Sequence, residues 1–119
     1  MPEMKKEPVH TLSWNEFLKV EMRVGTVLEA KINEKVRKPA YVLRIDFGER
    51  GILKSSAQIT ELYQPEDLIG RQVIAVVNFP AKQIANIKSE CLVLGTIGEG
   101  VAVTLIGPEQ PVENGLRIA

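Results

Sequence analysis

The sequence contains one cysteine, one histidine and six aromatic residues among its 119 positions. A single cysteine excludes an internal disulfide and is typical of a reducing compartment. The single histidine, His10, lies in a polar N-terminal segment. No internal imidazole is therefore available as the base for a serine or cysteine nucleophile, and no Cys/His cluster has the spacing of a zinc site. We expect a protein that is not an enzyme and uses no metal and no cofactor.

Long apolar runs are also missing. No stretch approaches the roughly 18–20 apolar residues that span a bilayer, and the first residues lack the apolar core of a secretory signal. We therefore expect a cytoplasmic protein without membrane insertion. Residues 1–12 are expected to form a flexible N-terminal tail, and residues 13–119 a single domain.

Charge is absent in sum but not locally. The formal net charge is zero, which argues against binding nucleic acid by bulk charge alone. Residues 31–54 nevertheless contain seven basic residues against three acidic ones. From residue 68 through residue 89 the only charged residues are Arg71, Lys82 and Lys88. These two segments suit a ligand that carries acceptor groups.

Alternation of apolar and polar residues predicts that most of the chain is strand. Tyr41, Leu43, Ile45 and Phe47 share one face of such a strand. We predict strands over residues 22–32, 41–47, 53–59, 73–77, 91–97, 101–106 and 116–118. Gly25 inside the long first strand predicts a bulge or a sharp bend.

A short helix is predicted before the first strand. Ser13 and Glu16 have capping-box spacing, in which each side chain satisfies the other residue's backbone amide. Trp14, Phe17 and Leu18 in this helix are placed to pack onto the rest of the domain.

A second helical connection, over residues 60–69, separates the third strand from the fourth. This order predicts an all-β protein, a five-stranded OB-fold barrel with extra C-terminal strands and the short N-terminal helix. Apolar strands beyond barrel closure leave an edge that must be covered. Self-association into a homodimer covers it most simply.

The candidate binding residues lie in two places: on the second and third strands with the loops beside them, the surface that OB-folds use for oligonucleotides, and in the loop that follows the strand over residues 73–77. Phe79 either plugs the barrel end or forms the floor of an apolar pocket, and packing in the core is favoured. A solvated face remains the alternative for Arg44 and Lys88. We predict that peptide or RNA is bound by Arg37, Lys38, Arg44, Lys54, Ser55, Ser56, Gln58, Asn78, Phe79, Lys82, Lys88 and Ser89. Cys91 lies in an apolar run and is predicted to be buried.

Several motifs resemble the tRNA-binding domain, which is found at the ends of some methionyl- and phenylalanyl-tRNA synthetases and in free-standing tRNA-binding proteins. They are Val24-Gly-Thr-Val, Ile45-Asp-Phe-Gly48, Leu68-Ile-Gly-Arg71 and the run from Val73 to Asn78. Three longer motifs resemble the CsaA-type export-related chaperones of that family. They are Arg37-Lys-Pro-Ala-Tyr41, Lys54-Ser-Ser-Ala-Gln-Ile-Thr60, and Val76-Val-Asn-Phe-Pro80 together with Lys88-Ser-Glu-Cys-Leu-Val-Leu-Gly95.

The resemblance implies a homodimeric OB-fold whose outer strands and termini form the dimer interface. It implies an ATP-independent chaperone that binds unfolded preproteins or peptides and assists protein export, with a component of the export translocase as a further candidate partner. The alternative is a structure-specific tRNA-binding protein that uses the same groove. Asn78, Lys82 and Ser89 fall at the family's binding-loop positions. Ala85 stands where the family has a loop glycine, and Glu90 adds a negative charge beside the expected phosphate path, which favours the chaperone.

Overall fold

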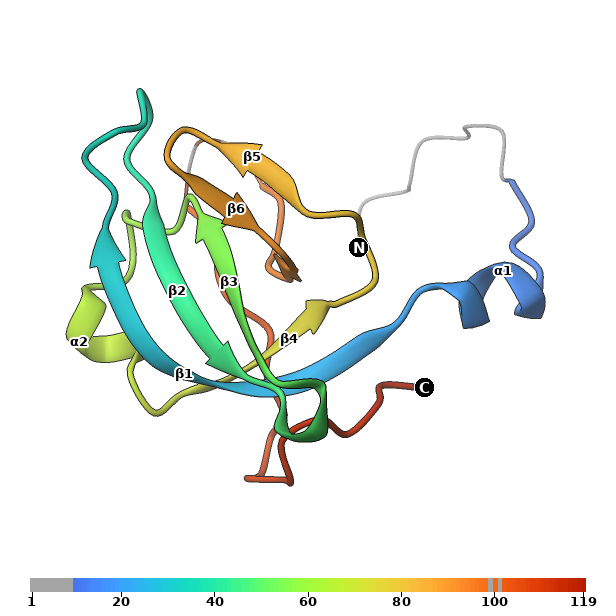
Figure 1. Ribbon diagram of the computed structural model, residues 1–119. Helices are drawn as coiled ribbons and strands as arrows, with labels where there is room; N and C mark the ends of the chain where they lie inside the picture. The colour runs from blue at the N-terminus through green and yellow to red at the C-terminus, as the bar shows by residue number, and fades with distance from the viewer. Residues whose placement is uncertain (1–9, 99, 101) are drawn as a thin grey trace, which may run out of the picture.

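The computed structural model describes residues 10–98, 100 and 102–119. Five antiparallel strands form one curved sheet in the order β3-β2-β1-β4-β7, and β5 and β6 form a separate hairpin. The sheet curls into a nearly closed barrel, and α2 lies beside β1 (Figure 1). The elements are α1 (Trp14–Lys19), β1 (Met22–Ile32), β2 (Tyr41–Asp46), the 3₁₀ turn η1 (Gly48–Arg50), β3 (Ile52–Ala57), α2 (Pro65–Leu68), β4 (Gln72–Val76), β5 (Lys82–Ile84), β6 (Ile87–Ser89) and β7 (Leu92–Val93). The predicted OB-fold is confirmed.

The alternation in β2 sets the core as predicted. Leu43, Ile45 and Phe47 are fully buried, and they pack with inward residues of β1 and β4 such as Val27 and Val73. Residues at i and i+2 of a strand point to the same face, so one strand delivers three large side chains to the barrel interior. The core is aliphatic with few rings, as the small aromatic content requires.

The bulge predicted at Gly25 lies elsewhere, and this glycine has a steric role. The irregularity in β1 lies between Val27 and Glu29, not at Gly25. A Cβ atom at Gly25 would approach Ile45 Cγ2 to 2.6 Å and Phe47 Cε1 to 2.7 Å. The glycine is therefore needed because Ile45 of β2 and Phe47, which directly follows β2, fill the space above it.

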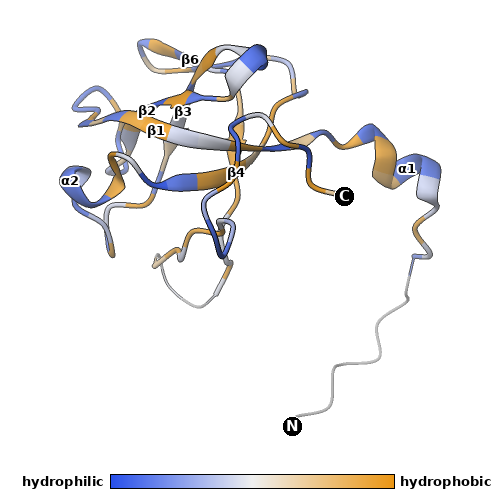
Figure 2. Cartoon of the chain, turned by 90° about the horizontal axis from the view of Figure 1, so that it is seen from below, coloured by the Kyte–Doolittle hydropathy of each residue, from blue (hydrophilic) through white to orange (hydrophobic). Residues whose placement is uncertain are grey.

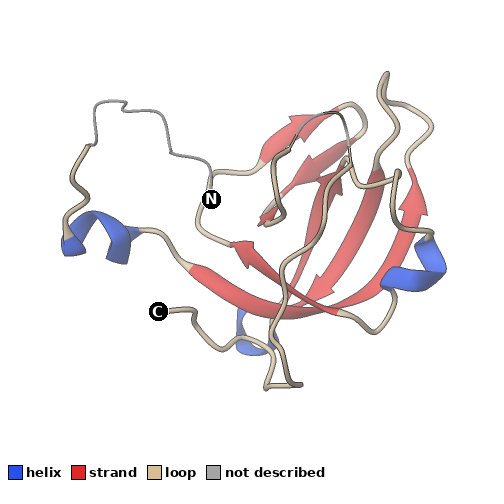
Figure 3. Cartoon of the chain, turned by 180° about the vertical axis from the view of Figure 1, so that it is seen from behind, coloured by secondary structure: helices blue, strands red, loops and turns tan. Residues whose placement is uncertain are grey.

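The C-terminal third contains less strand than predicted, and Figure 3 draws most of it as loop. The strand predicted over 91–97 shortens to β7, which pairs with β4. From the strand predicted over 101–106 a single bridge remains, Gly95 to Leu105, and Val101 lies outside the described residues. The last segment does run beside β1, because the Ile118 amide donates to the Met22 carbonyl and the Val24 amide to the Leu116 carbonyl.

The N-terminal helix forms as predicted but packs differently. Ser13 and Glu16 complete the capping box, each side chain accepting the other's amide at 3.1 Å. The expected packing of its apolar residues onto the domain is wrong for the single chain, because Trp14 is 81% exposed and Leu18 57% exposed. Figures 1 and 2 show α1 projecting away from the barrel. Residues 1–9 of the predicted tail lie outside the described residues.

Among the residues that the structure describes, neither helix has the length and apolar character needed to cross a bilayer.

Candidate ligand-binding groove

An open groove of about 670 Å³ lies at one end of the barrel. Its walls are the loop of residues 33–40 between β1 and β2, the end of β3, and the tip of the β5–β6 hairpin (Figure 1). Its lining residues combine cations, small polar groups and apolar side chains. They are Lys35, Val36, Arg37, Lys38, Ala40, Ser56, Gln58, Ile84 and Ala85.

The cationic wall is shaped by a local turn at the base of the 33–40 loop. The Asn33 amide donates to the Ala40 carbonyl at 3.0 Å, which closes the loop. The Asn33 Oδ1 atom accepts the Lys35 amide at 3.0 Å, and such a side-chain turn directs the chain outward. Arg37 and Lys38 therefore sit at the loop tip, exposed and facing the groove.

The opposite wall is the β5–β6 hairpin, where the sequence predicted only a loop without acidic residues. Ile84 pairs with Ile87, so Ala85 and Asn86 form a two-residue turn. Ala85 has φ +50°, a conformation that usually needs glycine or asparagine. The glycine expected from the family at this position was the available signal for the hairpin. Lys82 pairs with Ser89 and Lys88 with Gln83, so the two lysines point to opposite faces and are not concentrated at one place.

The hairpin is joined to the barrel along a seam, defined here as the contact of Lys54–Ser56 with Ser89–Cys91. The Glu90 amide donates to the Lys54 carbonyl at 2.7 Å. The amides of Lys54 and Ser56 donate to side-chain oxygens instead of main-chain carbonyls. Glu90 Oε1 accepts the Lys54 amide at 2.9 Å, and Ser89 Oγ accepts the Ser56 amide at 3.0 Å. Glu90 and Ser89 therefore close the barrel rather than lying free in the groove.

Ser55 lies beneath this seam, in the barrel interior. Its side chain is 1% exposed, and its hydroxyl donates to the Cys91 carbonyl at 3.0 Å. Cys91 is buried as predicted. Burial raises the pKa of the Cys91 thiol to about 12, so the thiolate is disfavoured and the side chain behaves as a small apolar group.

Arg44 and Lys54 extend the groove's polar surface onto the outer face of the sheet. They lie directly opposite each other on β2 and β3. The Arg44 guanidinium pairs with Glu29 at 3.4 Å, and both side chains are more than 40% exposed. Such an exposed pair contributes little to stability.

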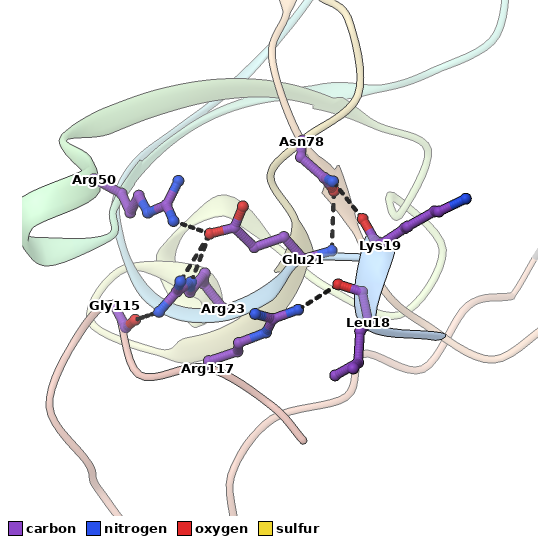
Figure 4. A network of polar contacts seen from close by, with 8 residues as sticks. All are labelled: Leu18, Lys19, Glu21, Arg23, Arg50, Asn78, Gly115 and Arg117. Atoms are coloured by element: carbon purple, nitrogen blue, oxygen red, sulfur yellow. Dashed lines mark hydrogen bonds and ion pairs between the residues drawn. The ribbon is translucent and has the colours of Figure 1, made fainter. Parts of the chain in front are cut away.

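Asn78 and Phe79 are not part of the groove. The Asn78 Nδ2 group donates to the Lys19 carbonyl at 2.6 Å, and its Oδ1 accepts the Glu21 amide at 3.0 Å, so this side chain fixes the junction of α1 and β1 (Figure 4). Phe79 is 55% exposed. It neither fills the core, as favoured, nor contributes to the lining of the groove.

The junction is reinforced by arginines that the sequence analysis did not single out. Arg117 donates to the Leu18 carbonyl at 2.7 Å, near the C-terminal end of α1. Arg23 donates to Glu21 and to the Gly115 carbonyl, and Arg50 pairs with Glu21 as well (Figure 4). The hydrogen bond from Arg23, with the charge of Arg50, lowers the pKa of the Glu21 carboxyl. These contacts hold α1 in its projecting position.

Four of the twelve predicted residues, Arg37, Lys38, Ser56 and Gln58, line the groove. The lining residues that the prediction lacked are Lys35, Val36, Ala40, Ile84 and Ala85. Within the described ranges, no three His, Cys, Asp or Glu side chains gather in a group that could hold a metal ion.

Comparisons with known proteins place these features in context. A family model described as a putative tRNA binding domain matches residues 22–117. The chaperone CsaA from Bacillus anthracis str. Ames superposes with a TM-score of 0.89 at 48% identity, covering 92% of this chain and 100% of that one. The CsaA chaperone protein from Picrophilus torridus gives a TM-score of 0.85 at 47% identity, with the same coverage.

The curated relatives are much longer proteins. A methionine–tRNA ligase from Methanothrix thermoacetophila is 35% identical over 117 residues, which is 97% of this chain and 16% of that enzyme. The matches to the ligases of Thermococcus kodakarensis and Methanopyrus kandleri cover 14% and 16% of their lengths. This chain thus spans about a sixth of the length of the curated relatives it matches.

Replacing Asn78 by alanine tests whether its role is structural. We expect Asn78→Ala to lower the free energy of unfolding by about 1 kcal/mol, because the Glu21 amide and the Lys19 carbonyl lose their partner, and to leave ligand affinity within about twofold. Urea unfolding and a binding titration measure the two effects. Gln110→Ala, which removes an exposed amide elsewhere, is the control. A loss of affinity without a loss of stability would contradict the structural role.

Proposed function

Because this chain belongs to the family of putative tRNA-binding domains, as a CsaA-type member, we propose that it is an ATP-independent chaperone. It binds unfolded preproteins and peptides in the groove and assists their export from the cytoplasm. A component of the export translocase is the further partner that this function requires. The methionine–tRNA ligases are about six times longer than this chain. We propose no catalytic reaction for it.

The chemistry of the groove supports this proposal. Val36, Ala40 and Ile84 offer apolar contact, while Arg37 and Lys38 offer charge at the rim. An unfolded segment exposes apolar side chains beside polar ones and has no fixed shape, so an open groove of mixed character suits it better than a closed pocket. The cations favour segments that carry acidic or acceptor groups between their apolar residues.

We also propose that the domain of residues 13–119 works as a homodimer, with α1 and the C-terminal segment in the interface. Trp14 and Leu18 on α1, with Leu92 and Leu116, are apolar and about half exposed or more. Trp14 also lines one hollow with Leu12, Phe17 and the C-terminal Ala119, and a contiguous exposed apolar surface of this kind marks an interaction site. Two copies also present two grooves on one body, which raises the effective concentration of the second groove for a bound client.

The second candidate function is tRNA binding, and the family match favours it. Lys35, Arg37 and Lys38 form a cationic edge that can contact phosphates. The position of Glu90 alters the argument from the sequence, because its carboxylate accepts the Lys54 amide within the seam. Its carboxylate therefore lies at the seam, and Glu90 is not among the groove-lining residues that include Lys35, Arg37 and Lys38.

The chaperone function predicts that a charge placed on the apolar side of the groove abolishes protection of a client. We expect Ile84→Asp to reduce the suppression of aggregation of a chemically unfolded client at least several-fold, because the groove then loses apolar contact area. Light scattering during dilution from urea measures the effect. Ile97→Asp, at a fully exposed position outside the groove, is the control. Failure of the unaltered protein to slow aggregation would contradict the function itself.

The dimer predicts a mass of twice 13.2 kDa in sedimentation equilibrium. We expect Trp14→Glu to shift the protein toward the monomer mass, because a charge is then placed on the most exposed apolar residue of α1. Leu62→Glu, on the loop before α2, should leave the mass unchanged. A monomer at micromolar concentration for the unaltered chain would rule out the dimer.

The tRNA function predicts a steep dependence of affinity on salt. Three phosphate contacts from Lys35, Arg37 and Lys38 give a log–log slope of about −3, and Arg37→Gln should flatten it by about 0.9. Lys19→Gln, on α1, should leave the slope unchanged. A flat titration for the unaltered protein would count against tRNA as the ligand.

A further inference from the structure

The tip of the β5–β6 hairpin holds an alanine in a conformation that favours glycine. Ala85 and Asn86 form the two-residue turn. Ala85 has φ +50°, and it is the only non-glycine residue with a positive φ in the part of the chain that the structure describes. Hairpin turns with a positive φ at the first central residue favour glycine there, because a Cβ atom crowds the main chain. The methyl group of Ala85 therefore strains the turn.

Contacts on both sides of Ala85 keep the turn in this shape. The Gln83 Nε2 group donates to the Ala85 carbonyl at 2.9 Å. Below the turn, the seam anchors β6 along β3. Strain at one residue persists where the surrounding structure determines its conformation, and these contacts do so. They use main-chain atoms at residue 85, so a glycine at this position could make the same contacts.

Packing inside the barrel does not account for the methyl group either. Ala85 is exposed, whereas Ile84 and Ile87 beside it are half-buried. Ala85 instead lines the groove together with Ile84, and Val36 and Ala40 belong to the opposite wall. A strained residue in the wall of a binding site is a candidate for a role in that site.

We propose that Ala85 is a specificity-determining residue of the groove. Its methyl group extends the apolar surface of Ile84, so that one apolar side chain of an unfolded polypeptide binds between the hairpin tip and Val36. Such contact removes the methyl group from water and favours binding. The inference rests on the proposed chaperone function and names the class of side chain that the groove selects.

The methyl group also bears on which class of ligand fits the hairpin tip. A glycine would let a polar ligand approach the main chain of the turn closely. The methyl group of Ala85 presents apolar surface at the same place, and a phosphate group offers no apolar contact in return. The exposed cations Arg37 and Lys38 lie in the other wall, where acidic residues beside the apolar side chain can reach them.

The first test is Ala85→Gly, which removes the methyl group and the strain together. The probe is a fluorescently labelled ten-residue peptide of Val, Ile, Phe and Glu, and the comparison peptide has Ser and Asn in place of its apolar residues. We expect the variant to bind the apolar peptide about fourfold more weakly, the effect of losing one buried methyl group. Both proteins should bind the comparison peptide equally weakly. Fluorescence anisotropy measures the affinities.

Stability separates this role from a structural one. The urea midpoint of Ala85→Gly should equal or exceed that of the unaltered protein, because glycine fits a positive φ. Weaker binding by an equally stable variant assigns the loss to the groove. Ala81→Gly is the matched control, since Ala81 is an exposed alanine just before β5 and outside the groove lining. It should bind the apolar peptide as the unaltered protein does.

The second test observes the contact directly on the unaltered protein. With ¹³C-labelled alanine methyl groups, we expect nuclear Overhauser effects between the Ala85 methyl group and the Phe ring of the bound apolar peptide. The Ala81 methyl group, in the same sample, should show none. Contacts of the ring with Val36 and not with Ala85 would overturn the inference.

The remaining outcomes separate this inference from the proposed function. If the apolar peptide binds and Ala85→Gly leaves its affinity unchanged, the inference is wrong and the chaperone function stands. Absence of binding by the unaltered protein contradicts both. A variant that gains affinity for tRNA and keeps its affinity for the apolar peptide would assign Ala85 to the exclusion of nucleic acid, and it would also overturn the inference.

Discussion

Closure of the barrel at the seam is the interaction on which the rest of the structure depends. Without it β3 is an edge strand, and the core beneath Ser55 opens to water. Ser89, Glu90 and Cys91 contribute to this closure, and two of their contacts use side-chain oxygens. The seam fixes the hairpin to the barrel, and the tip of that hairpin forms one wall of the groove.

The groove and the α1 junction lie on different parts of the barrel. At one end the 33–40 loop and the hairpin tip form the groove, and on another side Asn78 and Arg117 hold α1 away from the body (Figures 1 and 4). Between them lie the fully buried side chains of β2. The groove lining and the polar contacts of the α1 junction share no residue, so a change at the junction need not alter the groove. Self-association through α1 would leave the groove free for a client.

The sequence predicts the parts of the fold that depend on local pattern. Alternation placed the core residues of β2 correctly, and the capping box located α1. The seam and the role of Asn78 were missed because they depend on partners 33 to 59 residues away. The hairpin is local, since Ile84 pairs with Ile87, and it was missed because Ala85 stands where a glycine would mark the turn. Ser55 shows the limit most clearly. Its alternation with Leu53 and Ala57 already indicated the interior, yet its hydroxyl suggested a ligand, and the structure gives that hydroxyl a buried carbonyl instead.

The choice between peptide and RNA depends on the mixed chemistry of the groove lining. Surface cations are satisfied by water and salt, so Arg37 and Lys38 favour any anionic partner only weakly. Val36, Ala40 and Ile84 add apolar surface to the same groove, and an unfolded polypeptide can bury apolar side chains against it, which a phosphate backbone cannot do. Glu90 bears on this choice from outside the groove, because its carboxylate accepts the Lys54 amide within the seam. The residue that looked like an obstacle to phosphate therefore helps to close the barrel.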